Sequence, residues 1–134
     1  MPSPTVRSVE LLEREGWTVD RCERQLTRRI KKDLFGFADL IAVAALGQLA
    51  SLRSRLGVDE DGRPRQRFGN LAVQVTAGTE NLMHRLHKIV AEPRALTWLA
   101  ASPHNGIEIH CWRALKGEVE PSVRLRVVTK EDFA

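Results

Sequence analysis

The sequence predicts an α/β (α+β) domain in which a mixed central sheet is flanked by helices in three layers. The chain has 134 residues, enough for one hydrophobic core. Segments with strand-like alternation are interleaved with segments of helical periodicity, in the order α-β-β-β-α-α-β-β. The sequence contains no internal repeat, coiled coil or low-complexity run. We therefore expect a single domain over residues 1–134.

The first half of the chain is expected to supply a helix and three strands. Residues 5–15 have helical apolar spacing and end at Gly16, a residue that favours a helix stop. Residues 17–25 alternate between apolar and polar side chains and should form the first strand. Residues 37–46 are almost continuously apolar, as expected for a strand covered on both faces, and residues 70–76 should form the third strand.

Two connections in this half have a different character. Residues 27–36 are too basic to lie in a core and are expected to form a loop or a hairpin turn. Residues 47–69 form an insertion, with weak helical periodicity at first and turn-forming residues around Gly62 and Pro64. Such an insertion either contacts a substrate or only lengthens the hairpin connection between two strands.

The second half should contain two helices and two strands. The first helix opens at residues 78–80 and runs to about residue 90, with Leu82 and Leu86 on its apolar face. The second helix begins at Pro93, which is tolerated in a first turn. Two strands should follow, at residues 107–115 and residues 122–128.

The distribution of charge favours a polyanionic partner. The chain carries 21 Lys and Arg against 17 Asp and Glu, a net charge of +4. The basic residues gather in two groups: Arg21, Arg24, Arg28, Arg29, Lys31 and Lys32, and then Arg53, Arg55, Arg63, Arg65 and Arg67. We expect residues 21–32 and 53–67 to form the two walls of a groove for nucleic acid, with a solvated charged surface as the alternative.

The composition also bears on location. No apolar run is long enough to span a bilayer, and the first residues have no signal-peptide pattern. We therefore expect a cytoplasmic protein with no membrane partner. In such a reducing compartment Cys22 and Cys111 should be free thiols.

An acidic residue and a polar pair stand on neighbouring predicted strands. Asp39 lies near the start of an apolar strand, where a lone acid is costly unless it is paired, binds a metal or lies at the sheet edge. On the next strand Gln74 and Thr76 flank Val75, so both polar side chains point to one face. This layout is typical of a metal site.

The pattern KKDLFGFADLIAV followed by LAVQVT resembles the core of the PD-(D/E)XK nuclease superfamily, in which an Asp opens one strand and Glu-x-Lys or Gln-x-Lys lies on its neighbour. It is more closely similar to small Holliday-junction-resolvase-like and VRR-NUC-like endonucleases of phages and mobile elements. The resemblance covers about residues 10–112. It implies a restriction-endonuclease-like αβββαβ core and a DNA endonuclease or resolvase-like activity that depends on Mg²⁺ or Mn²⁺. Homodimers are common among such enzymes.

The resemblance also assigns roles to residues of the site. Asp39 and Gln74 would bind the metal together with the backbone carbonyl of Val75. Thr76 stands where the family has a lysine. The replacement cation would come from Lys32, Lys31, Arg29 or Lys88. A third acid would come from Glu23, Glu10 or Asp33, ranked in that order.

Residues for DNA contact follow from the same comparison and from the basic groups. They are Arg24, Arg28, Arg29, Lys31, Lys32, Arg85 and Lys88. A threonine cannot replace the positive charge of the family lysine. Thr76 therefore leaves a second function open, a nuclease-fold protein that has lost catalysis and binds DNA or a protein partner.

Overall fold

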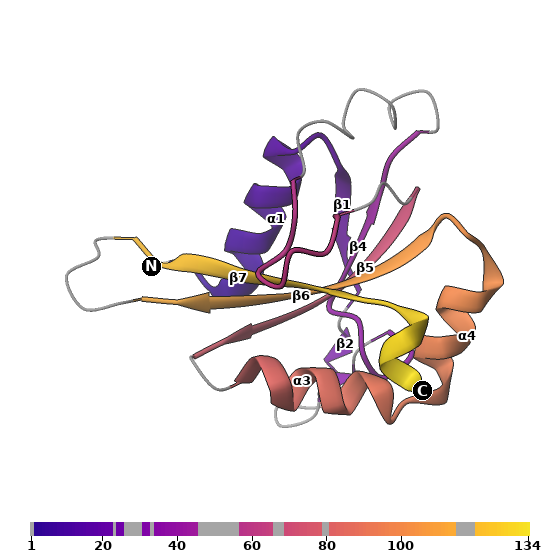
Figure 1. Cartoon of the computed structure of the whole chain (residues 1–134). Coiled ribbons are helices and arrows are strands. Elements are labelled where there is room, and N and C mark those ends of the chain that lie inside the picture. The colour runs from indigo at the N-terminus through magenta and orange to yellow at the C-terminus, as the bar shows by residue number, and fades with distance from the viewer. Residues whose placement is uncertain are drawn as a thin grey trace.

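A five-stranded mixed sheet with helices on both faces forms the body of the computed structural model (Figure 1). The structure describes residues 2–22, 24–25, 31–32, 34–45, 57–65, 69–78, 81–114 and 120–134. The helices and the strands of the main sheet follow one another as α1, β1, β4, β5, α3, α4, β6 and β7. This confirms the predicted fold class and the predicted order α-β-β-β-α-α-β-β.

The strands of the main sheet are adjacent in the order β1-β4-β5-β6-β7. Their bounds are β1 Thr18–Arg21, β4 Leu40–Val43, β5 Asn70–Ala77, β6 Asn105–Arg113 and β7 Ser122–Val128. β5 and β6 are parallel, and the other neighbouring pairs are antiparallel. A parallel pair needs a crossover connection, and α3 (Asn81–Val90) with α4 (Pro93–Ala101) provides it.

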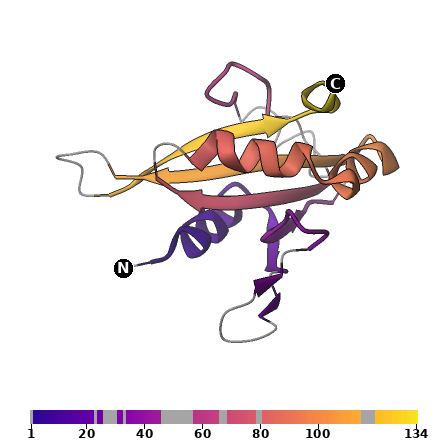
Figure 2. The same ribbon diagram turned by 90° about the horizontal axis from the view of Figure 1, so that it is seen from below.

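A second, two-stranded ribbon lies between β1 and β4 in the chain. It consists of β2 (Arg24–Gln25) and β3 (Lys31–Lys32), paired antiparallel with Arg24 opposite Lys32. In Figure 2 this ribbon projects away from the main sheet. We refer to β2 and β3 as the basic hairpin. It agrees with the hairpin alternative for residues 27–36 and shortens the first predicted strand, which ends at Arg21 instead of residue 25.

The predicted strand 37–46 is also shorter in the structure, because its first residues fold into a tight turn. The Phe37 N–H donates to the Leu34 carbonyl across 3.1 Å, and Leu34 bridges Ala38. Phe35 and Gly36 between them both have positive φ, of 52° and 76°, the pattern of a type I′ turn. Phe37 and Ala38 are therefore buried by a turn, and β4 begins at Leu40.

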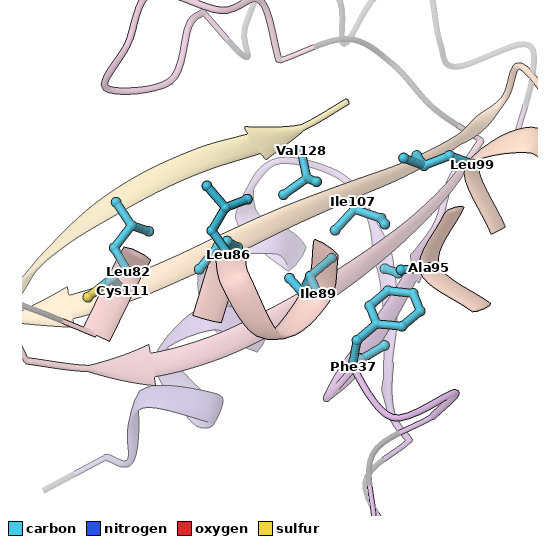
Figure 3. Packing of buried hydrophobic residues seen from close by; sticks show 12 residues of the cluster. Phe37, Leu82, Leu86, Ile89, Ala95, Leu99, Ile107, Cys111 and Val128 are labelled. Carbon is cyan, nitrogen blue, oxygen red and sulfur yellow. The ribbon is translucent and has the colours of Figure 1, made fainter. Parts of the chain in front are cut away.

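Each face of the sheet has its own apolar layer. Ala72, Ile107 and Ile109 pack with Leu86 and Ile89 of the α3 and α4 layer (Figure 3). On the opposite face α1 (Pro4–Arg14) packs through Leu12 against a second set, made of Leu40, Leu71, Val73 and Val75. Alternation along β5 thus sends odd-numbered residues toward α1 and even-numbered residues toward α3 and α4.

The start and end of the chain are fixed by local hydrogen bonds. The Ser3 side chain accepts a hydrogen bond from the Val6 N–H and caps α1. After β7, a 3-10 helix, η2 (Lys130–Phe133), closes the chain. Cys22 and Cys111 form no disulfide, and their thiols donate to the carbonyls of Ala38 and Gly78. Within the residues described, no helix combines the length and apolar character needed to cross a membrane.

Candidate functional site

Asp39 and Gln74 meet between β4 and β5, two neighbouring inner strands of the main sheet, and this adjacency was predicted from the sequence. Asp39 directly precedes β4 and is only 5% exposed, and Gln74 lies within β5 and is 1% exposed. The Gln74 Nε2 donates to Asp39 Oδ2 across 2.8 Å. The Val75 N–H donates to the same oxygen across 2.7 Å. One carboxylate oxygen thus holds both a side chain and the backbone of β5.

The register of the strands explains why this carboxylate lies there. Leu40 is paired with Val73, so β5 extends past the point where β4 begins. The Val75 N–H therefore has no partner in β4, and Asp39 provides the acceptor instead. In a strand the N–H and C=O of one residue point to the same side. The Val75 carbonyl consequently points to the same side of β5 as its N–H, the side on which Asp39 lies.

Gln74 contributes an oxygen whose hydrogen-bonding capacity is unused. Its Oε1 is buried and has no hydrogen-bond partner in the part of the chain that the structure describes. Rotation of the amide would exchange Oε1 and Nε2, two atoms that are told apart only by their hydrogen-bond partners. After such a rotation Gln74 Oε1 would face the Asp39 carboxylate, and both are hard oxygen donors, the donor type that Mg²⁺ prefers.

Thr76 lies on the same face of β5 as Gln74, because the two alternate with Val75. Its side chain is buried beneath the layer of α3 and α4. A threonine hydroxyl carries no charge, so this position adds nothing to the charge of the site.

The structure does not bring Glu10 to this pair. Glu10 is exposed on α1, which covers the opposite face from Gln74. The prediction of Glu10 as the third acid therefore disagrees with the structure, because helical periodicity identified the solvent face of α1 but not the face of the sheet that α1 covers. The other two candidates, Glu23 and Asp33, lie outside the described residues.

One carboxylate and two neutral oxygens do not make a complete protein cage for a metal ion. Among the residues that the structure describes, no group of three His, Cys, Asp or Glu side chains could hold a metal ion. A site built on Asp39, Gln74 and Val75 has a single carboxylate and depends on further oxygen ligands from a substrate.

The basic hairpin is joined to the site at both of its ends. On one side Cys22 precedes β2, and its N–H donates to the Asp39 carbonyl across 3.0 Å. On the other side β3 leads into the turn of residues 34–38 and then to Asp39. Arg24, Lys31 and Lys32 lie on the hairpin itself, and Arg28 and Arg29 fall outside the described residues.

The two basic candidates on α3 differ in their surroundings. Arg85 is half-buried, and its Nε is buried without a hydrogen-bond partner in the described part of the chain. Lys88 is exposed in the last turn of α3. Both lie on the helix that covers the Gln74 face of the sheet.

The prediction that residues 53–67 form the second wall of a nucleic-acid groove is wrong for Arg63 and Arg65, the two arginines of that group that the structure describes. Arg65 is buried and donates to Glu15 and Glu108, with Nη1 to Glu15 Oε2 at 2.7 Å and Nε to Glu108 Oε2 at 3.0 Å. Arg63 is paired with Asp132 at 2.9 Å. Both residues fasten the segment 57–65 to the sheet. The remaining members of that group, Arg53, Arg55 and Arg67, lie outside the described residues.

A buried polar network beneath α1 was not anticipated. Glu108 Oε1 lies 3.0 Å from His110 Nε2, and His110 Nδ1 lies 2.9 Å from Ser8 Oγ. Trp112 Nε1 donates to the same Ser8 oxygen across 2.8 Å. Burial raises the pKa of Glu108, but the His110 hydrogen bond and the Arg65 charge outweigh it and lower that pKa to about 2.

This network is structural in character. Ser8 and His110 are completely buried, and their polar side-chain atoms are hydrogen-bonded to one another, to Glu108 and to Trp112. The sequence did contain a signal: Glu108 and His110 alternate within an apolar strand, as Gln74 and Thr76 do, and buried polar groups require partners.

Comparison of the chain with protein-family models, with curated proteins and with solved structures finds no significant match.

Proposed function

We propose that this protein binds DNA and cleaves its phosphodiester backbone as a Mg²⁺- or Mn²⁺-dependent endonuclease or resolvase-like enzyme. The observation that carries the proposal is the contact of the buried Asp39 carboxylate with Gln74 and Val75 at the start of β4, beside a basic hairpin. Mg²⁺ in enzymes of this kind is often held by one or two protein carboxylates together with substrate phosphates. A single carboxylate is therefore compatible with a site that is completed by DNA.

Each residue of the site would have a separate role. Asp39 would hold the ion through its carboxylate, Val75 through its carbonyl, and Gln74 through Oε1 after rotation of its amide. A bound cation supplies Lewis-acid activation of the phosphate and of the attacking water. Arg24, Lys31 and Lys32 would attract the DNA backbone without reading its sequence.

A positive charge near the scissile phosphate would have to replace the family lysine. Thr76 cannot supply it. Lys31 and Lys32 on the basic hairpin, Lys88 on α3, and Arg29 are the candidates, because long side chains can cover the distance from a neighbouring element.

A second function is favoured by one specific contact. The Gln74 Nε2 and the Val75 N–H both donate to Asp39, so this carboxylate has hydrogen-bond partners without an ion. Together with Thr76, this arrangement suits a protein of nuclease-like fold that binds DNA without cutting it.

One experiment separates the two functions. Wild-type protein, Asp39→Asn and the control Asp20→Asn, an exposed position on β1, are incubated with plasmid and branched DNA in Mg²⁺ or Mn²⁺. Binding of Mn²⁺ in the presence of uncleavable DNA is measured in parallel. The enzyme proposal expects cleavage and Mn²⁺ binding by wild type and Asp20→Asn, and neither by Asp39→Asn. Salt-sensitive DNA binding without cleavage by any protein would establish the second function.

A further inference from the structure

Phe35 has a backbone conformation that its side chain does not favour. Within the described residues it is the one non-glycine residue with positive φ, at 52°. Type I′ turns place Asn, Asp or Gly there, because a bulky side chain in the left-handed region is strained. Burial of the ring would offset that strain, yet Phe35 is 43% exposed. Retained strain at an exposed aromatic residue is a reason to look for a ligand.

The Phe35 ring borders a mainly apolar hollow of about 300 Å³. The hollow is lined by Phe35, Arg94, Thr97, Trp98, Ala101 and Asn105. Its walls are fixed by hydrogen bonds: Trp98 Nε1 donates to the Gly106 carbonyl and Asn105 Nδ2 donates to the Trp98 carbonyl, both across 2.9 Å. Two aromatic side chains, Phe35 and Trp98, therefore border a preformed space at the lower end of the size range of small-molecule sites.

The turn that carries Phe35 is held against α4. A Cβ at Gly36 would lie 2.8 Å from Glu92 Oε1 and 2.9 Å from Arg94 Nη2, so the turn fits closely over the start of that helix. Leu34 bridges Ala38 across the base of the turn, and Phe37 is buried in the core. The backbone at Phe35 is thus already ordered in the absence of a ligand, which lowers the entropic cost of binding.

Positive charge lies close to this aromatic pair. Consecutive Cα atoms are about 3.8 Å apart, so the Cα atoms of Lys32 and Phe35 lie within about 11 Å of each other. Arg94 also borders the hollow, where its guanidinium is paired with the Glu92 carboxylate. A basic track beside aromatic rings is how proteins bind unpaired nucleotides, with phosphates on the cations and bases stacked on the rings.

We infer that Phe35 and Trp98 receive one unstacked nucleobase from a nucleic acid whose phosphates lie along the basic hairpin. This inference rests on the proposed function and extends it, because it makes the preferred substrate a branched, bulged or frayed DNA. A fully paired duplex offers phosphates to the hairpin but no base to the hollow.

Trp98 provides a direct measurement. Trp17 and Trp112 are buried, whereas Trp98 is half-buried at the hollow, so a stacked base should quench mainly its fluorescence. Three DNA probes share one sequence: a duplex with an unpaired adenine, the same duplex with an abasic residue at that place, and the fully paired duplex. Wild-type protein should bind the adenine bulge about tenfold more tightly than the abasic bulge, with quenching of Trp98. Trp98→Phe should remove the quenching signal.

Two variants test the role of Phe35. Asn tolerates the left-handed conformation, so Phe35→Asn should fold with an equal or higher Tm. It should lose the preference for adenine over the abasic residue and still bind the paired duplex as wild type does. Met83→Ala, which removes an exposed apolar side chain from α3, is the control and should change neither property.

The outcomes distinguish this inference from the proposed function. Equal binding of the adenine and abasic bulges by wild type, or an unchanged preference in Phe35→Asn, would overturn the inference. Salt-dependent binding of the paired duplex in the same assay would leave the proposed function intact. Failure of all three probes to bind would overturn both.

Discussion

Asp39 accepts a hydrogen bond from Gln74 across 2.8 Å and, through the same oxygen, another from the Val75 N–H across 2.7 Å. The carboxylate therefore has a structural task as well as a proposed catalytic one. It accepts the hydrogen bond of the Val75 N–H, which lies beyond the last paired residues of β4 and β5, Leu40 and Val73. Substitutions at Asp39 must separate these two tasks.

The first prediction compares Asp39→Ala with Asp39→Asn. Alanine leaves two buried donors unpaired, at about 1–3 kcal/mol for each. Asparagine keeps one acceptor oxygen, which in the place of Oδ2 accepts from both the Val75 N–H and Gln74 Nε2, so its free energy of unfolding should stay close to wild type. Urea denaturation measures the free energy of unfolding of both variants. Equal destabilisation by the two substitutions would show that the negative charge itself, and not the hydrogen bonds, stabilises this part of the sheet.

The second prediction concerns the basic hairpin. Replacing Lys31 and Lys32 with alanine removes two phosphate contacts, so the slope of log K against log salt for duplex DNA should become shallower by about 2. The matched control replaces Arg14 and Lys130, which are exposed on α1 and η2 and carry the same total charge. If both double variants change the slope equally, net charge and not the hairpin determines the affinity.

Much of the fold was predictable because the apolar periodicities were long and clear. β7 occupies the predicted residues, and the strands of Asp39 and Gln74 are neighbours as expected. The late start of the second strand, at Leu40 instead of residue 37, was not predicted. A turn was expected within residues 27–36, but turn chemistry disfavours phenylalanine at positive φ, so the sequence did not place that turn at Phe35 and Gly36.

The predictions for the site that proved wrong concern residues whose contacts are with distant parts of the chain. Arg65 looked like one member of a basic surface, but its partners Glu15 and Glu108 are 50 and 43 positions away. Periodicity cannot pair residues at such separations. The contact between Asp39 and Gln74 could be predicted from the sequence, because each residue interrupts an apolar strand and unpaired polar groups in such strands are costly.

The third prediction tests the buried ion pairs of Arg65. Arg65→Met leaves the buried Glu108 carboxylate without its main countercharge and should lower the free energy of unfolding by about 3–5 kcal/mol. Arg124→Met removes the more exposed pair with Glu60 and should cost less than about 1 kcal/mol. Similar losses in the two variants, measured by urea denaturation, would contradict a special role for burial.

The fourth prediction follows from the depressed pKa of Glu108, about 2. The unfolded carboxyl has a pKa near 4.3. The folded state therefore binds fewer protons than the unfolded state between these values. The stabilisation is complete above about pH 5 and is lost as the pH falls toward 2. Thermal unfolding of wild type should become steeply pH-dependent in that window, and Glu108→Gln should flatten the dependence. An unchanged profile would assign the acid sensitivity to other carboxylates.

The last prediction concerns Thr76→Lys, which restores the residue that the family resemblance implies. Positions 74 and 76 lie on one face of β5, about 7 Å apart along the strand, so a lysine at 76 can bring its ammonium group to the oxygens of Asp39 and Gln74. If the missing charge limits cleavage, the single-turnover rate at saturating DNA should rise by about a hundredfold. The buried position should make the protein less stable, by about 1–3 kcal/mol.

Ala77→Lys is the matched control for this substitution, because it adds the same charge one position further along β5 but on the opposite face. An equal rise in rate with Ala77→Lys would mean that added charge acts through DNA affinity or general electrostatics, and not through the site. If wild type and Thr76→Lys are both inactive while Mn²⁺ is bound, the missing lysine is not what prevents cleavage. In that case the function of Asp39 and Gln74 is to stabilise the sheet between β4 and β5, and the protein binds DNA without cutting it.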